Sequence, residues 1–328
     1  MVEARDRASS GEEEDQFKDE SFIDKPAILD KYKAAALITN AALQKVISLT
    51  VVGADIYKVA QEGDAFIEEE LKKIFNNKKS KKLERGIAFP TCISVNNICG
   101  HYSPLADEST VLKEGDIAKI DLGCHLDGFI TQAAQTVLVS ADPAARVTGK
   151  AADAVVAAYN AFLAAQRTIG EGATNTQVTQ AIAKVCEEFG EVTPLEGVLS
   201  HKVKKHLIDG NDVIINKETS EQKVEEWEFM PGDVIALDVY VSTGEGKPRE
   251  SEFRTTVFKR ELDAQYNLKI KSSRAFFAEV NKRFPTLPFA IRAFSDHVGA
   301  KIGVKECIEH DLITAYPVLT EKAGEVVA

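Results

Sequence analysis

The sequence predicts an α/β (α+β) protein built from two similar halves. Two amphipathic helices open the chain after an acidic stretch, and a second pair of helices follows a strand-rich segment. A short motif also recurs, because Gly115 and Gly232 each precede an Asp, open a strand and are followed six residues later by a further Asp, Asp121 or Asp238. These observations favour two αβ halves that face each other, with Asp121 and Asp238 converging. The alternative is two ordinary Gly-Asp strand entries.

The first two helices are predicted by apolar residues that recur at helical spacing over about 26–49 and 54–75. Each helix would present one apolar face to a core. Residues 1–22 are acidic and carry no apolar period, so we expect a disordered tail there. A charged loop, 76–85, follows the second helix.

A β-hairpin is predicted over residues 117–139. Asp127-Gly128 is a two-residue turn signal between two runs of strand-forming residues. We expect Asp121 and Gln132 to come close across this hairpin, because side chains on one face of paired strands are neighbours.

The second half opens with helices over about 149–168 and 176–189. Thr174 and Gln177 have the spacing of a capping box, and Gly190 stands where a helix would end. Strands and one further helix are expected after them, at 213–215, 233–241, 251–258 and, for the helix, 271–283.

Composition narrows the class of protein. The chain of 328 residues has a net charge of −11, which argues against a generic nucleic-acid binder but leaves room for local basic surfaces. Its five cysteines are widely spread and form no CxxC pair, which favours reduced thiols. The polar N-terminus does not resemble a secretory signal, and no apolar run is long enough for a membrane span. We therefore expect an intracellular protein that does not associate with membranes.

Several polar residues could form one site at the junction of the two halves. They are His101, Asp121, Gln132, His201 and Asp238. A two-metal hydrolase needs carboxylates that bridge two divalent ions and activate a water between them. Gln132 is a neutral amide and a poor bridge. On the residues alone, a buried Asp is more often a hydrogen-bonded structural group, and His201 beside several lysines could lie on the surface.

Several longer motifs resemble a known family. Four resemble the signature of type 2 methionine aminopeptidases: residues 86–91 (GIAFPT), 94–97 (SVNN), 101–104 (HYSP) and 119–123 (KIDLG). Others resemble the proliferation-associated, ErbB-receptor-binding protein family, whose fungal members have been called curved DNA-binding proteins: 199–201 (LSH), 206–210 (HLIDG), 241–247 (VSTGEGK), 273–277 (SRAFF) and 316–327. The similarity extends from about residue 24 to the end, with the motifs in one order.

The resemblance implies the pita-bread aminopeptidase fold, with two pseudo-symmetric halves, over residues 23–328. A helical insert is implied at about 261–310. The final strand of the fold, which would carry a bridging Glu, and a Lys-rich tail are expected beyond Ala328, where this sequence stops.

The resemblance also implies a site that has lost catalysis. His101, Asp121 and His201 match a substrate-facing His, a metal Asp and a metal His of the active enzymes. Gln132 stands where a second metal Asp is expected, and Asp209 where a second pocket His is expected. Asp238 matches a metal Glu but is one methylene shorter. We therefore expect a pseudoenzyme with no metal, cofactor or catalytic residue, whose vestigial pocket consists of His101, Asp121, Gln132, His201, Asp209 and Asp238.

What the family implies instead is binding to the large ribosomal subunit, to rRNA and to other RNA, with roles in ribosome biogenesis and translation regulation. Cytoplasmic and nuclear or nucleolar locations and a monomer are expected. Three basic groups are candidate RNA contacts: Lys78, Lys79, Lys81, Lys82 and Arg85; Lys202, Lys204 and Lys205; and, in the insert, Lys269, Lys271 and Arg274, with Lys282, Arg283 and Arg292 nearby. Such groups neutralise phosphates. The alternative reading of a Lys-rich loop is a solvated surface.

Two other functions stay open. A working methionine aminopeptidase would need a carboxylate in place of Gln132. The second is a transcriptional regulator or adaptor that binds DNA or protein, which a salt-dependent preference for curved DNA over ribosomes would favour. No RRM or KH signature is present, so recognition of shape and phosphate is expected rather than reading of bases.

Overall fold

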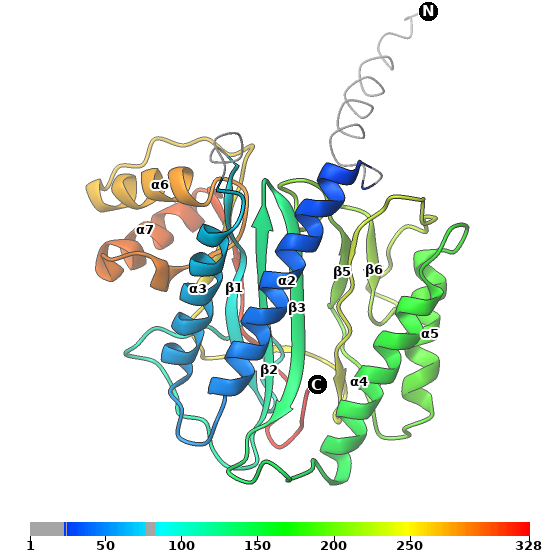
Figure 1. Cartoon of the computed structure of the whole chain (residues 1–328). Coiled ribbons are helices and arrows are strands. Elements are labelled where there is room, and N and C mark those ends of the chain that lie inside the picture. The colour runs from blue at the N-terminus through cyan, green and yellow to red at the C-terminus, as the bar shows by residue number, and fades with distance from the viewer. Residues whose placement is uncertain (1–22, 24, 77–82) are drawn as a thin grey trace, which may run out of the picture.

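The computed structural model of the chain describes residues 23, 25–76 and 83–328. The expected acidic tail and the lysines at 78, 79, 81 and 82 lie outside these residues. Strands run through the middle of the molecule, and helices cover them from the outside (Figure 1). No helix within the described part is long and apolar enough to cross a membrane.

The first half consists of two helices on a three-stranded antiparallel sheet. The helices are α2 (Pro26–Leu49) and α3 (Ile56–Lys73), which confirms both predicted helices. They cover β1 (Arg85–Val95), β2 (Ile117–Leu126) and β3 (Phe129–Leu138), which pair in that order (Figure 1). The buried faces of helices and sheet form one apolar core, and each fully buried aliphatic side chain contributes about 1.5–3 kcal/mol there.

Both ends of α3 are satisfied by side chains. Asp55 accepts a hydrogen bond at 3.1 Å from the backbone N–H of Lys58 at the start of the helix. At the other end, the guanidinium of Arg85 donates to the carbonyl oxygens of Leu71 at 3.1 Å and Ile74 at 2.7 Å. The first residue of β1 therefore caps the helix that precedes it.

The hairpin of β2 and β3 turns at Asp127-Gly128, as expected, with φ of 57° and 79°. The register differs from the expected one. Asp121 lies opposite Ala134, and Gln132 lies opposite Gly123. The two polar residues thus share a face of the sheet but are diagonal neighbours, two positions apart.

The second half repeats the helix pair. The helices are α4 (Gly149–Thr168) and α5 (Asn175–Glu187), and the predicted capping box is present at the start of α5. They pack on the short strands β4 (Thr193–Pro194), β6 (Val213–Ile215) and β8 (Val241–Ser242) (Figure 1). Four fully buried alanines at helical spacing let α4 lie close to its neighbours: Ala154, Ala157, Ala161 and Ala165.

The two Gly-Asp motifs form equivalent turns. Gly115 and Gly232 have φ of 86° and 92°, a region that glycine enters without strain. After the first, the Asp116 carboxylate accepts from the backbone N–H three residues earlier at 2.8 Å. After the second, Asp233 makes the same bond at 2.9 Å. The motif is therefore a structural repeat that precedes one strand in each half, β2 (Ile117–Leu126) and β7 (Ile235–Ala236).

The strand expected at 233–241 is interrupted. Ladder pairing covers only β7 (Ile235–Ala236) and β8. Between them, the Ser200 hydroxyl of β5 (Leu199–Lys202) bonds both the N–H of Asp238 at 2.9 Å and its carbonyl at 3.1 Å. Asn216 donates to the carbonyl of Tyr240 at 2.7 Å. Side chains take the place of backbone partners here, and Asp238 therefore lies between the two paired strands rather than in one of them.

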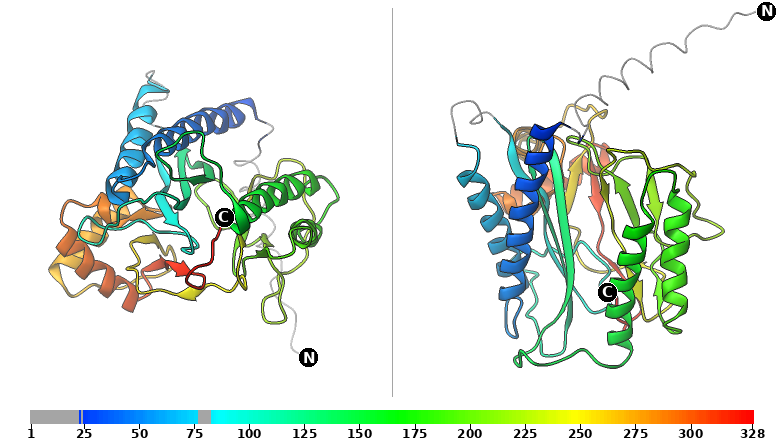
Figure 2. Two further views of the ribbon diagram at one scale, coloured as in Figure 1. Left: turned by 90° about the horizontal axis from the view of Figure 1, so that it is seen from below. Right: turned by 45° about the vertical axis from the view of Figure 1, so that its right-hand side comes forward.

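The insert between β10 (Val257–Arg260) and β12 (Ile313–Tyr316) contains two packed helices, α6 and α7, below α3 in the left view of Figure 2. These span Lys271–Arg283 and His297–Glu309. A phenylalanine-rich core of their own holds them together. The strand expected at 251–258 starts only at Val257. Shorter elements complete this region: β9 (Arg249–Glu250), β11 (Phe289–Ala290), η1 (Ile291–Ala293) and β13 (Leu319–Thr320).

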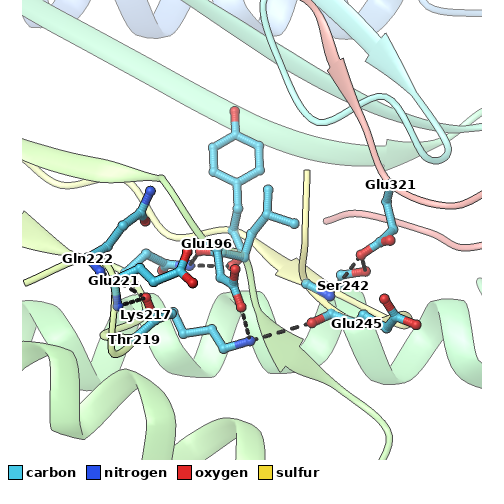
Figure 3. A network of polar contacts seen from close by, with 12 residues as sticks. Glu196, Lys217, Thr219, Glu221, Gln222, Ser242, Glu245 and Glu321 are labelled. Carbon is cyan, nitrogen blue, oxygen red and sulfur yellow. Dashed lines mark hydrogen bonds and ion pairs between the residues drawn. The ribbon is translucent and has the colours of Figure 1, made fainter. Parts of the chain in front are cut away.

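Residues 319–328 bridge the two halves. The backbone N–H of Cys99 in the first half donates to the carbonyl of Leu319 at 2.8 Å, and Val241 in the second half exchanges two bonds with Ala328 at 2.9 and 3.0 Å. The buried carboxylate of Glu321 accepts from the Ser242 hydroxyl at 3.0 Å (Figure 3).

A buried lysine anchors the same segment. The Lys119 ammonium on β2 donates to the carbonyl oxygens of Asn96 at 3.0 Å and Val327 at 2.8 Å. Burial lowers the pKa of Lys119 to about 7.

Candidate pocket and nucleic-acid interface

Asp121 and Asp238 meet between the two halves. Burial, and after it the negative charge of Asp238, raises the pKa of Asp121 to about 8, while burial raises the pKa of Asp238 to about 7. Near pH 7 the pair therefore keeps at least one proton when no cation lies between the carboxyl groups. The sequence repeat predicts that these two residues converge, and the charge of Asp238 acts on Asp121 in the structure.

Gln132 lies beside this pair without completing it. Its side chain is exposed and extends across Gly123, where an added Cβ would come within 2.8 Å of the Gln132 Cγ. The amide can accept or donate a hydrogen bond, but it cannot offset the charge of a cation. The position diagonal to Asp121 is thus occupied by a group of no net charge.

His101 has a left-handed backbone conformation, with φ of 62°. Its ring packs beside Phe89 and Tyr316, with ring centroids 5.8 and 5.4 Å away. The Nδ1 atom lies 3.2 Å from the carbonyl oxygen of Pro317. Burial lowers the pKa of His101, so the ring is neutral at pH 7.

His201 and Asp209 are both held by other parts of the protein. His201 lies on β5 with its Nδ1 atom 3.0 Å from the carbonyl oxygen of Gly210. Asp209 forms an ion pair with the ammonium of Lys259 on β10. The carboxylate at this position is therefore neutralised by the protein itself.

Sequence reasoning missed two residues that lie beside the aspartates. Cys92 lies directly opposite Asp121 in the β1–β2 ladder, and Tyr240 follows Asp238 by two positions. Burial is the main cause that raises the pKa of each, and the nearby aspartates add to it. The period of two along a strand could have identified Tyr240. Cys92 required the register of the sheet.

The donor set does not fit a pair of divalent ions. Such ions need several charged oxygen ligands, of which two should bridge. Gln132 brings no charge and Asp209 is paired with Lys259, which leaves Asp121 and Asp238 as the only carboxylates of the predicted set without a cationic partner among the residues that the structure describes. Across residues 25–76 and 83–328, no three His, Cys, Asp or Glu side chains are grouped as a metal site requires.

The candidate basic residues differ in how far they are available. The guanidinium of Arg85 already donates hydrogen bonds to carbonyl oxygens at the end of α3. Lys202 forms ion pairs with Asp233 at 2.7 Å and Asp212 at 3.5 Å and lies over the ring of Trp227. Lys204 is exposed, whereas Lys205 is half-buried with its ammonium 5.7 Å from the centre of the Phe129 ring.

The insert offers the more accessible charges. Lys269 and Lys271 are exposed at the start of α6. Arg274 is also exposed, but it donates to the carbonyl oxygens of Leu268 at 3.0 Å and Lys269 at 2.7 Å. Arg292 does not belong to this surface, since its side chain is 2% exposed and paired with Asp64.

Comparison with known families identifies the class. A model described as metallopeptidase family M24 matches residues 30–261 of this chain. The chain therefore belongs to this family and has its pita-bread fold. A methionine aminopeptidase from Thermotoga maritima shares the fold, with a TM-score of 0.57 and 23% identity over 71% of this chain and 86% of that one.

Individual relatives narrow the group. The chain is 47% identical to proliferation-associated protein A of Dictyostelium discoideum, over 92% of this chain and 77% of that protein. It is 44% identical to the ERBB-3 binding protein 1 of Solanum tuberosum (96% and 80% covered) and 38% identical to the curved DNA-binding protein of Schizosaccharomyces pombe (93% and 80%). A solved thermophilic Arx1 superposes with a TM-score of 0.85 at 29% identity, over 93% of this chain and 86% of that one. Within family M24 the chain thus falls in the proliferation-associated and ERBB-3-binding group.

Proposed function

We propose that this protein is a non-catalytic member of family M24 that binds the large ribosomal subunit and its rRNA, in ribosome biogenesis and translation. The observation that carries the loss of catalysis is the donor set of the pocket. An exposed amide at Gln132, and a carboxylate at Asp209 neutralised by Lys259, leave too few charged ligands for two metal ions.

The surface of the insert supports the binding role. Lys269 and Lys271 are exposed side by side at the start of α6, and neither forms an ion pair within the described residues. Lysines in this state can contact phosphates and release the counterions that surround RNA. Lys204 is a further exposed cation among the candidates. Arg85 and Lys202 contribute less, because their charged groups already have partners.

The loss of catalysis is tested by release of methionine from a Met-Ala-Ser peptide with cobalt or manganese supplied. We expect no release above the buffer. Release that disappears in Asp121→Ala would show that the pocket does hold metal, and the non-catalytic assignment would be wrong.

Ribosome binding is tested by co-sedimentation with purified large subunits over a range of salt concentrations. We expect the double variant Lys269→Glu/Lys271→Glu to bind more weakly, with a smaller salt dependence, because each lost phosphate contact reduces the log–log salt slope by about 1. The double variant Lys223→Glu/Lys247→Glu makes the same charge change at exposed positions in the second half and serves as the control. Equal loss in both would mean that only net charge matters.

A second function is favoured by one relative, whose name states that it binds curved DNA. The same exposed lysines could neutralise DNA phosphates. Competition between ribosomal subunits and curved DNA at a fixed salt concentration separates the two. Fluorescent tagging in cells tests the proposed cytoplasmic and nucleolar locations.

A further inference from the structure

A pocket lies between α3 and the insert. It has a volume of about 340 Å³ and is lined by the last turns of α3, the start of β1, His125 of β2 and the segment that follows α6. This volume is in the range of small-ligand sites. We refer to it as the α3–α6 pocket.

The charge of the α3–α6 pocket is positive. Four cationic side chains and two carboxylates line it, the cations being Lys72, Arg85, Lys282 and Arg283 and the carboxylates Glu68 and Glu84. Lys72 and Lys282 are exposed and come from opposite walls, α3 and α6. Such an arrangement suits an anion held between two ammonium groups.

His125 supplies an unused donor at the floor of the pocket. Its side chain is 5% exposed, and its Nδ1 atom accepts a hydrogen bond at 3.2 Å from the backbone N–H of Gly128. The neutral ring therefore carries its proton on Nε2. Among the described residues, none accepts a hydrogen bond from that atom. The Nε2–H group is therefore available to donate to an acceptor bound in the pocket.

Arg283 provides a flat surface on the wall. Its guanidinium lies 4.8 Å from the centre of the Phe284 ring and 5.7 Å from that of Phe294, and Phe284 stacks on Phe289 at 5.3 Å. Arg283 also donates at 2.6 Å to Glu279 and at 2.7 Å to the carbonyl of Ala293. The guanidinium plane is thus fixed, and planar bases stack on such planes.

We propose that the α3–α6 pocket binds one nucleoside phosphate. The phosphate lies between Lys72 and Lys282, the base stacks on the Arg283 guanidinium, and the Nε2–H of His125 donates to a ligand oxygen or nitrogen. The nucleotide can be a free molecule or one unit of a single strand. This site is independent of the ribosome proposal, because it uses neither Lys269 nor Lys271.

The experiment is calorimetric titration of the full chain with AMP, adenosine and inorganic phosphate. We expect saturable binding of AMP at one site and at least tenfold weaker binding of the other two, since each offers half of the contacts. Lys282→Glu should weaken AMP binding at least tenfold. Lys305→Glu, the same change at an exposed position of α7 away from the pocket, should leave it unchanged. A 5′-phosphorylated trinucleotide that displaces AMP would identify a strand as the source, and one that does not would identify a free nucleotide.

The role of His125 is tested separately by recording the imidazole ¹⁵N spectrum of the unmodified protein. We expect the Nε2 resonance to shift on addition of AMP. His125→Gln, which keeps an N–H donor, should retain binding better than His125→Leu. An absence of saturable AMP binding at millimolar concentration, equal affinity in Lys282→Glu and the unmodified protein, or an unmoved Nε2 resonance at saturation would each overturn the proposal.

Discussion

Lys259 of β10 forms an ion pair with Asp209, the residue that stands where the resemblance to active aminopeptidases leads one to expect a pocket histidine. The two side chains are 15% and 32% exposed, so the pair is mostly shielded from solvent. Asp209 and Lys259 therefore neutralise each other within the folded protein.

The first prediction concerns this pair. Lys259→Met should lower the free energy of unfolding by about 1–3 kcal/mol, because it leaves the Asp209 carboxylate half-buried without a partner. Asp209→Asn in the same background should recover much of that loss. Urea unfolding of the two single variants and the double variant measures the coupling, and additive effects would show that the pair contributes nothing.

Asp121→Asn should stabilise the protein at pH 8. The folded state raises the pKa of Asp121 to about 8, so this carboxyl favours folding at low pH and becomes unfavourable as the pH rises from about 4 to about 8. Removal of the charge should raise the free energy of unfolding at pH 8 by about 2 kcal/mol, a value reduced because the group is partly exposed. Thermal unfolding at pH 5 and pH 8 tests this. A variant that is less stable at pH 8 would indicate that a bound cation needs the carboxylate.

His125 should contribute to acid sensitivity. Burial, and then the nearby His206, lowers the pKa of His125 from 6.5 to about 4. The unfolded chain takes up a proton below pH 6.5 before the folded chain does, so stability falls from there to about pH 4, by about 3 kcal/mol in all. His125→Gln should lose this part of the pH dependence. Parallel curves for the two proteins between pH 7 and pH 4 would contradict the assignment.

Glu321→Ala should destabilise the contact between the two halves. The carboxylate is buried and also accepts from the backbone N–H of Gly246 at 2.8 Å and of Lys322 at 2.8 Å. Its removal leaves these donors unsatisfied, which should cost about 2–4 kcal/mol. Glu325→Ala, in the same segment but bonded nearer the surface to Thr243 and Lys150, should cost less. Equal losses for both variants would show that Glu321 has no special role.

Much of the fold could be predicted because the helices are strongly periodic. α2, α4 and α6 have the predicted bounds, since their apolar faces and end signals agree. The correct hairpin register could also have been derived from the sequence. A two-residue turn at Asp127-Gly128 pairs Leu126 with Phe129, and counting back from there pairs Asp121 with Ala134. The interruption of the strand at Asp238 could not be predicted, because it involves hydrogen bonds from the hydroxyl of Ser200 on another strand.

The candidate site, too, could be predicted only in part from the sequence. The repeated motif was enough to bring Asp121 and Asp238 together. The state of the charged residues depends on partners far away in the chain, such as Asp64 for Arg292 and the carbonyls of α3 for Arg85. A basic residue in a list of motifs therefore says little about a basic surface until its neighbours are known.

The segment 319–328 also determines when the fold can be completed. Its hydrogen-bond partners lie near residue 97 in one half and near residue 242 in the other, and the buried ammonium of Lys119 donates to the carbonyl of Val327. During synthesis, the first helices and hairpin can form while the ribosome is still translating the second half. The seam between the halves cannot close until these late residues have emerged. Folding of the whole domain is thus governed by contacts of long sequence separation, and a shortened nascent chain would retain two loosely joined halves.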